Sequence, residues 1–174
     1  MRLSSDFIEV AEQIARLGNR RPKQAALRRA ISTAYYAAFH FLVEETTRHL
    51  AGTRASDEKL RAFIARGITH SAVKTVCKAV SSGNWPSIVE QRIGKGTLGV
   101  PSQPLKNVAA AFVNLQELRH TADYDPLHRF SRADAIVQVD RAKALLKDWS
   151  TVAASDERTF FLYLMGVTSS RRED

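Results

Sequence analysis

Two segments of the sequence, far apart along the chain, carry polar side chains that could bind a phosphate. The first spans residues 28–40 and the second spans residues 118–126. Chemistry at a phosphate needs a cation for the negative charge and a base for any proton that is removed. Arg119 can supply the cation. The other candidate catalytic side chains of the second segment are His120, Asp123 and Tyr124.

The residues around Arg119 allow more than one interpretation. Arg119 and Asp123 lie one helical turn apart, so the simplest alternative is an exposed ion pair worth only about 0.3 to 0.5 kcal/mol. That alternative leaves His120 and Tyr124 unexplained. A tyrosine hydroxyl, with a pKa of about 10, is a poor base near neutral pH, so Tyr124 would orient a phosphate or donate a proton. His120 or His128 could replace it as the base. Because His120 lies about 100° around the helix from Arg119, it would act from the partner subunit or only support the structure.

The first segment combines an apolar and a polar stripe on one helix. At helical spacing the apolar stripe consists of Leu27, Ile31, Ala34, Ala38 and Phe41, and the polar stripe of Arg29, Thr33, Tyr36, His40 and Glu44. Helix faces that meet water usually carry Lys and Glu, so Tyr and His between alanines indicate a half-buried face whose polar groups need partners. The candidate substrate-binding residues of this segment are Arg28, Arg29, Tyr36 and His40.

The charge of the chain favours nucleic acid as a partner. Lys and Arg total 26 against 18 Asp and Glu, which gives a net charge of +8 and a sequence pI of about 10.0. No acidic residue occurs between Glu12 and Glu44, and the basic residues there are Arg16, Arg20, Arg21, Lys23, Arg28 and Arg29. Because the planar guanidinium suits phosphate, this cluster predicts a protein that binds nucleic acid.

Apolar residues recur with helical spacing along nearly the whole chain, which predicts an all-α protein. We expect one domain over residues 1–168, followed by a charged tail over 169–174. The expected helices span 5–17, 22–50, 56–67, about 70–80, 104–123, 131–149 and 156–167, the second of them a long central helix. Residues 81–104 hold four Gly and three Pro, so they are predicted to form a long irregular loop.

Several classes of protein are not expected from the composition. The single cysteine, Cys77, excludes an intramolecular disulfide and fits a reducing compartment, so we place the protein in the cytoplasm. No apolar run approaches the roughly 20 residues of a membrane span, and the first residues do not resemble a signal peptide. The five histidines are scattered, so we expect no metal and no other cofactor.

Taken together, the two segments resemble those of the HEPN superfamily, in particular its small stand-alone members. The matching pieces are residues 29–40, 69–73, 118–119 and 122–125. The resemblance implies a compact helical bundle that forms a homodimer and acts as a metal-independent endoribonuclease, as the toxin of a toxin-antitoxin or phage-defence system. It makes Arg119 the motif arginine and His120 the polar residue that often follows it. Tyr124 stands at the nearest position where the family has its histidine.

Two alternatives to a ribonuclease follow. The first is a HEPN module that binds nucleotide or RNA without cutting it, or that docks a partner such as a nucleotidyltransferase. The displaced histidine favours this alternative. The second is a helical scaffold in which Arg119 and Asp123 form a surface pair and Tyr36 and His40 a satisfied contact of the core.

Overall fold

The computed structural model describes residues 3–18 and 22–167, and over this range the protein is built from helices without a β-strand. The all-α prediction is confirmed. The elements are α1 (Leu3–Arg16), α2 (Gln24–Ala51), the 3₁₀ turn η1 (Ala55–Asp57), α3 (Glu58–Gly67), α4 (His70–Ser81), α5 (Ser87–Ile93), α6 (Gln103–Tyr124), α7 (Arg132–Trp149) and α8 (Asp156–Val167). None of the helices so described combines the length and the apolar character that crossing a bilayer requires. The predicted tail over 169–174, together with Asn19, Arg20 and Arg21, lies outside the described residues.

By their contacts the residues divide into two compact units. Unit 1 comprises Met1–Phe41 and Ala111–Lys147, and unit 2 comprises Leu42–Ala110 and Asp148–Asp174. All eight candidate site residues belong to unit 1. The structure that positions the candidate site is therefore that of unit 1.

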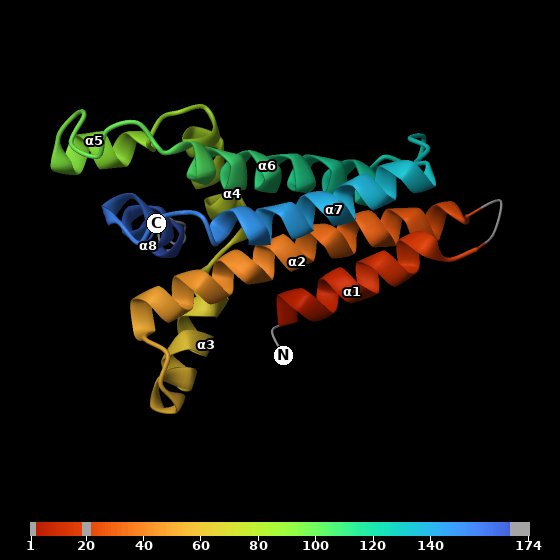
Figure 1. Cartoon of the computed structure of the whole chain (residues 1–174), viewed down its shortest axis with the longest axis horizontal. Helices are drawn as coiled ribbons and strands as arrows, with labels where there is room; N and C mark the ends of the chain where they lie inside the picture. The colour runs from red at the N-terminus through yellow and green to blue at the C-terminus, as the bar shows by residue number, and fades with distance from the viewer. Residues whose placement is uncertain (1–2, 19–21, 168–174) are drawn as a thin grey trace. The chain divides into compact units, whose positions relative to one another are not determined.

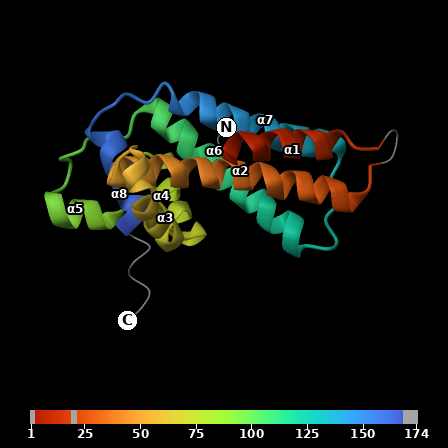
Figure 2. The ribbon, with the colours of Figure 1, turned by 90° about the horizontal axis from the view of Figure 1, so that it is seen from below.

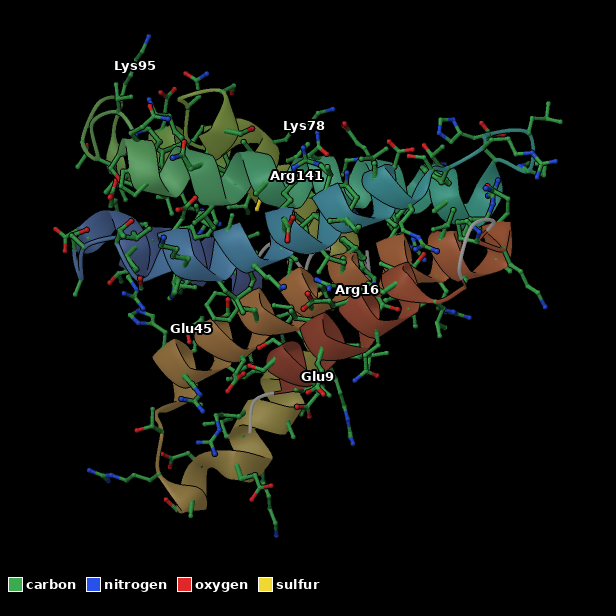
Figure 3. The ribbon with its side chains drawn as sticks, turned by 45° about the vertical axis from the view of Figure 1, so that its right-hand side comes forward. Glu9, Arg16, Glu45, Lys78, Lys95 and Arg141 are labelled. Carbon is green, nitrogen blue, oxygen red and sulfur yellow. The ribbon has the colours of Figure 1, made fainter. Side chains whose placement is uncertain are left out.

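Unit 1 is a four-helix arrangement of α1, the first part of α2, the second part of α6, and α7. Neighbouring helices run antiparallel (Figure 1), and a second view from below agrees (Figure 2). Side chains link each neighbouring pair: Phe7 with Tyr36, Arg28 with the Ala122 carbonyl, Arg141 with Asn114, and Lys143 with Glu12. Figure 3 labels Arg141 on α7, on the side toward α6.

The core of unit 1 is built from small residues on α2 and aromatic rings that fill the space beside them. Tyr35 and Phe112 are fully buried, with ring centroids 5.6 Å apart. The five residues of the predicted apolar stripe are all buried, which confirms that stripe: Leu27, Ile31, Ala34, Ala38 and Phe41. Each fully buried large side chain contributes about 1.5 to 3 kcal/mol, so this face holds α2 in its place within unit 1.

The loops at one end of unit 1 are fixed by specific polar contacts. Ser131 accepts a hydrogen bond from the Asp134 N–H at 3.1 Å, and the Asp134 carboxylate accepts the Ser131 N–H at 2.7 Å. These bonds form a capping box. The bonds that the Asp134 carboxylate accepts from the Ser131 N–H and the Ser131 hydroxyl lower its pKa below the usual range. Arg132 donates to the carbonyls of Leu17 and Gly18, at the end of α1.

Unit 2 contains the segment that the sequence predicted as a long irregular loop, and that prediction is wrong in part. Residues 87–93 form the short helix α5, with Pro86 as its N-cap and Val89 buried. The Trp85 indole donates to the Gly99 carbonyl at 3.0 Å and ties the two ends of the segment together. Seven residues are too few to show a helical period, because they cover barely two turns. The long contact between Trp85 and Gly99 has no sequence signal.

The remainder of unit 2 is held by apolar packing and one buried carboxylate. Helices α4 and α8 pack together. Thr69 caps the N-terminus of α4, where its hydroxyl accepts the Ala72 N–H at 3.2 Å. Glu45 accepts the indole N–H of Trp149 at 2.8 Å and pairs with Arg158 at 3.2 Å. These two bonds satisfy a carboxylate that is largely removed from water.

Candidate functional site

Arg119 is the centre of the candidate site, and it lies among tyrosine rings. Its guanidinium carbon is 5.8 Å from the ring centroid of Tyr35, 5.9 Å from that of Tyr36 and 5.5 Å from that of Tyr124. Its Nη2 reaches the Tyr36 hydroxyl at 3.5 Å. A cation within about 6 Å of an aromatic face is attracted by the ring, so three such faces hold the guanidinium in position. The side chain of Arg119 remains 22 % exposed, which leaves an anion a path to it.

Asp123 connects Arg119 to α2. Its Oδ2 lies 2.6 Å from Arg119 Nε, while its Oδ1 accepts the Ser32 hydroxyl at 2.5 Å. The Nε–H of Arg119 has no hydrogen-bond partner among the described residues, so the contact with Asp123 is an ion pair without hydrogen-bond alignment. The carboxylate therefore orients the guanidinium through charge, and Ser32 orients the carboxylate.

The charge on Arg119 is stabilised by its surroundings. Burial of the guanidinium lowers its pKa, but the nearby Asp123 carboxylate, followed by Tyr36 and Tyr124, raises it by more, and the pKa ends above its ordinary value. Arg119 is therefore a fixed cation at any pH at which the protein would work. Such a group can stabilise negative charge on a phosphate, but it cannot take a proton from a hydroxyl.

Arg28 holds the end of α6 and the turn that follows it. Its guanidinium donates to the carbonyls of Ala122 at 2.7 Å, Asp125 at 2.8 Å and His128 at 2.6 Å. The Asp125 carboxylate in turn accepts the N–H groups of Leu127 and His128 at 3.0 and 3.2 Å. Arg28, a predicted substrate-binding residue, thus fixes the backbone around Asp123.

An open cleft of about 410 Å³ lies between α2 and α6, and we call it the α2–α6 cleft. Its lining residues are Ala25, Arg28, Arg29, Ser32, Ala122, Asp123 and Tyr124. Arg29 is exposed, and its side chain makes no hydrogen bond or ion pair within the described parts of the chain. Tyr124 is 64 % exposed, and its ring lies 4.9 Å from that of His120. The cleft thus offers a free cation and an exposed aromatic pair.

Two of the candidate histidines, His40 and His128, do not line the α2–α6 cleft. His40 stacks on Phe7 of α1, with ring centroids 5.1 Å apart and planes 9° apart. His128 packs on Phe130 at 4.3 Å, in the turn that Arg28 holds. Of the histidines considered, His120 is the one that adjoins the cleft, through its contact with Tyr124.

The structure also corrects the polar stripe and adds two residues to the site. Thr33 is buried and donates to the Arg29 carbonyl at 2.7 Å, so it does not belong to a polar surface. Ser32 and Tyr35, which sequence reasoning missed, contact Asp123 and Arg119. The sequence did indicate that Ser32 could belong to the site, because it lies one helical turn from Arg28 on the same face. Nothing in the sequence indicated that Tyr35 contacts Arg119, since a buried aromatic residue of a helix usually belongs to the core.

The half-buried His40 gives unit 1 a dependence on pH. Burial lowers the pKa of His40, so the folded protein binds this proton less readily than the unfolded chain, whose histidines titrate near about 6.5. The contribution of the neutral ring is complete above that value and is lost as the pH falls below it. Urea unfolding at pH 7.5, 6 and 5 should show falling stability, and His40→Gln should reduce that fall. An equal fall in both proteins would contradict the assignment.

Other chemistry finds little support in the part of the chain that is described. No three His, Cys, Asp or Glu side chains gather there in a way that could hold a metal ion. Cys77 is buried in unit 2, and burial raises the pKa of its thiol far above the ordinary value. A thiol of this kind is a poor nucleophile because the reactive thiolate is absent.

Comparison with known proteins found no match among family models, curated proteins or solved structures.

Proposed function

We propose that the protein binds RNA through the α2–α6 cleft of unit 1, as a HEPN-type protein. The observation that carries this proposal is the presence, in one cleft, of the exposed ring of Tyr124 and of the Arg29 guanidinium, which has no partner among the described residues. Arginine binds phosphate through a planar fork, and an exposed aromatic ring offers a face on which an unpaired base can stack. His120 extends this aromatic surface by one ring.

Charge reversal at Arg29 tests this proposal. We expect Arg29→Glu to weaken binding of a single-stranded RNA by about tenfold or more, since a hydrogen bond to a charged group is worth about 1.5 to 3 kcal/mol. The milder Arg29→Ala should lower the salt dependence of the affinity by about 0.7 in the logarithmic slope, which corresponds to one phosphate contact. Fluorescence anisotropy with a labelled oligonucleotide, measured at several salt concentrations, gives both quantities.

A matched control is available on unit 2. Lys78 is exposed on α4, and Figure 3 shows it extending from its helix. Lys78→Glu makes the same change in net charge as Arg29→Glu at a position outside the cleft. If the two variants lose affinity equally, binding follows the overall charge of +8 and the cleft has no special role.

We propose further that the bound RNA is cleaved without a metal, with Arg119 stabilising the charge that develops on the phosphate. Arg119 is not among the lining residues of the cleft, but its partly exposed guanidinium contacts Asp123 and Tyr124, which do line it, and this position supports the proposal. His120 is our candidate base, because its ring adjoins Tyr124, which lines the cleft. Tyr124 would orient the phosphate, and Asp123 would position Arg119. In a cell such an activity would make the protein a toxin, and a neighbouring protein would neutralise it.

A non-catalytic role is the second candidate, and a specific feature favours it. The neighbours that hold the Arg119 guanidinium are tyrosines and Asp123, and its charge is already paired. Binding of RNA or nucleotide, or docking of a nucleotidyltransferase, would then be the function. RNA binding that Arg29→Glu abolishes, without fragments under any condition, would support this candidate.

Dimerisation is a part of the proposal, because a second subunit could bring another histidine to the cleft. Light scattering at increasing protein concentration would test it. A monomer at all concentrations would exclude a shared site.

A further inference from the structure

Among the described helices of ten or more residues, α3 of unit 2 contributes the fewest buried side chains to the core. None of its ten residues is buried. Its main packing neighbour is the 3₁₀ turn η1 that leads into it. A helix of ten residues is not stable in water by itself, because the cost of forming its first turn is not recovered over so short a length. Helical order here must be supported from elsewhere.

The polar contacts around η1 explain how α3 is held in place. Arg61 donates to the carbonyls of Gly52 at 3.0 Å and Arg54 at 2.9 Å. Asp57 accepts the Arg54 N–H at 3.1 Å. Gly52 has φ of +88°, and a Cβ there would lie 2.8 Å from Asp57 Oδ2, so the position requires glycine. The base of α3 is therefore fixed while its outer face stays uncovered.

That outer face is an apolar strip with a basic edge. Phe63 is 75 % exposed and Leu60 is 50 % exposed, and helical spacing places them on one side with Ile64. Lys59 and Arg66 flank Phe63 on the same exposed side. Neither cation forms an ion pair or a hydrogen bond with any described residue. The amphipathic face thus combines an exposed aromatic anchor with two free positive charges.

We propose that this face of α3, which we call the α3 face, docks an acidic segment of a partner protein that contributes apolar side chains. Aromatic residues and arginine are enriched among the residues that dominate binding at protein interfaces. A second copy of this chain would bring the same two cations against Lys59 and Arg66, and its net charge of +8 would add repulsion. An acidic segment would neutralise both cations while it covers Phe63 and Leu60.

A photocross-linking experiment identifies the occupant. Phe63→p-benzoylphenylalanine is introduced into the full chain in its source cells, and the cross-linked peptide is sequenced by mass spectrometry. We expect a peptide of another protein that has net negative charge and apolar residues. A cross-link to a second copy, to another part of the same chain, to lipid or to a basic segment would overturn the proposal, as would no cross-link in protein that carries the probe.

The identified peptide is then synthesised and its affinity for the purified protein is measured. Phe63→Ser and the double variant Lys59→Glu with Arg66→Glu should each weaken binding at least tenfold. The control is Arg92→Glu with Lys95→Glu, which changes the charge by the same amount at exposed positions elsewhere on unit 2. Equal losses in both double variants would overturn the proposal.

The melting temperature separates docking from folding in this experiment. Because Phe63 is exposed, Phe63→Ser should leave the melting temperature of the isolated protein unchanged. A large drop would show that Phe63 belongs to the core and would also overturn the proposal.

Discussion

Arg119→Ala is expected to abolish RNA cleavage and, in cells, growth inhibition by the protein. The variant removes the cation that three tyrosine rings and Asp123 hold in position. Loss of one group that stabilises developing charge in a transition state commonly lowers the rate by about 100- to 1,000-fold. Since the raised pKa of Arg119 keeps the group charged, the loss should be the same across the neutral pH range.

Incubation of purified protein with total RNA and tRNA in excess EDTA measures this effect directly. Wild type should produce fragments with cyclic-phosphate ends, and Arg119→Ala should produce none. Arg119→Lys is the matched variant, because it keeps the charge but loses the planar fork, and it should retain a small part of the activity. Equal cleavage by wild type and Arg119→Ala would exclude Arg119 from the site. An absence of fragments from wild type would favour the binding role.

Arg28→Ala is expected to lower the free energy of unfolding by about 2 to 3 kcal/mol. The three carbonyl groups that Arg28 holds belong to the end of α6 and to the turn after it. Each of the three hydrogen bonds has a charged donor. In the variant, water can bind the exposed carbonyls in place of Arg28, so the loss of unfolding free energy is smaller than the sum of three such bonds. Urea unfolding followed by circular dichroism gives the change.

Arg129→Ala is the control for this prediction. Arg129 is exposed in the same turn and its side chain has no partner among the residues described, so its removal should change stability by less than about 0.5 kcal/mol. Amide hydrogen exchange should quicken at residues 122–128 in Arg28→Ala alone. If the two variants are equally stable, the contacts of Arg28 do not hold the turn in solution.

Local features of the sequence determined most of the helices. The apolar stripe of α2 is buried residue by residue, because 3.6 residues per turn bring those positions to one side whatever packs against them. Ser131 caps α7 because its hydroxyl and the Asp134 carboxylate are three residues apart, which is a distance that the helix itself sets. The ion pair of Arg119 with Asp123 could be predicted in the same way, since the two residues are one helical turn apart.

Only the tertiary structure decided how the candidate site is assembled. The sequence places Arg28 and Arg29 side by side, yet Arg28 is bound to three carbonyls, while Arg29 lines the cleft and has no partner within the described part of the chain. Likewise His40 stacks on Phe7, and Ser32 reaches Asp123 across 91 positions of sequence. The physical reason is that periodicity fixes which face of a helix a residue occupies, whereas its partner depends on how the helices pack against each other.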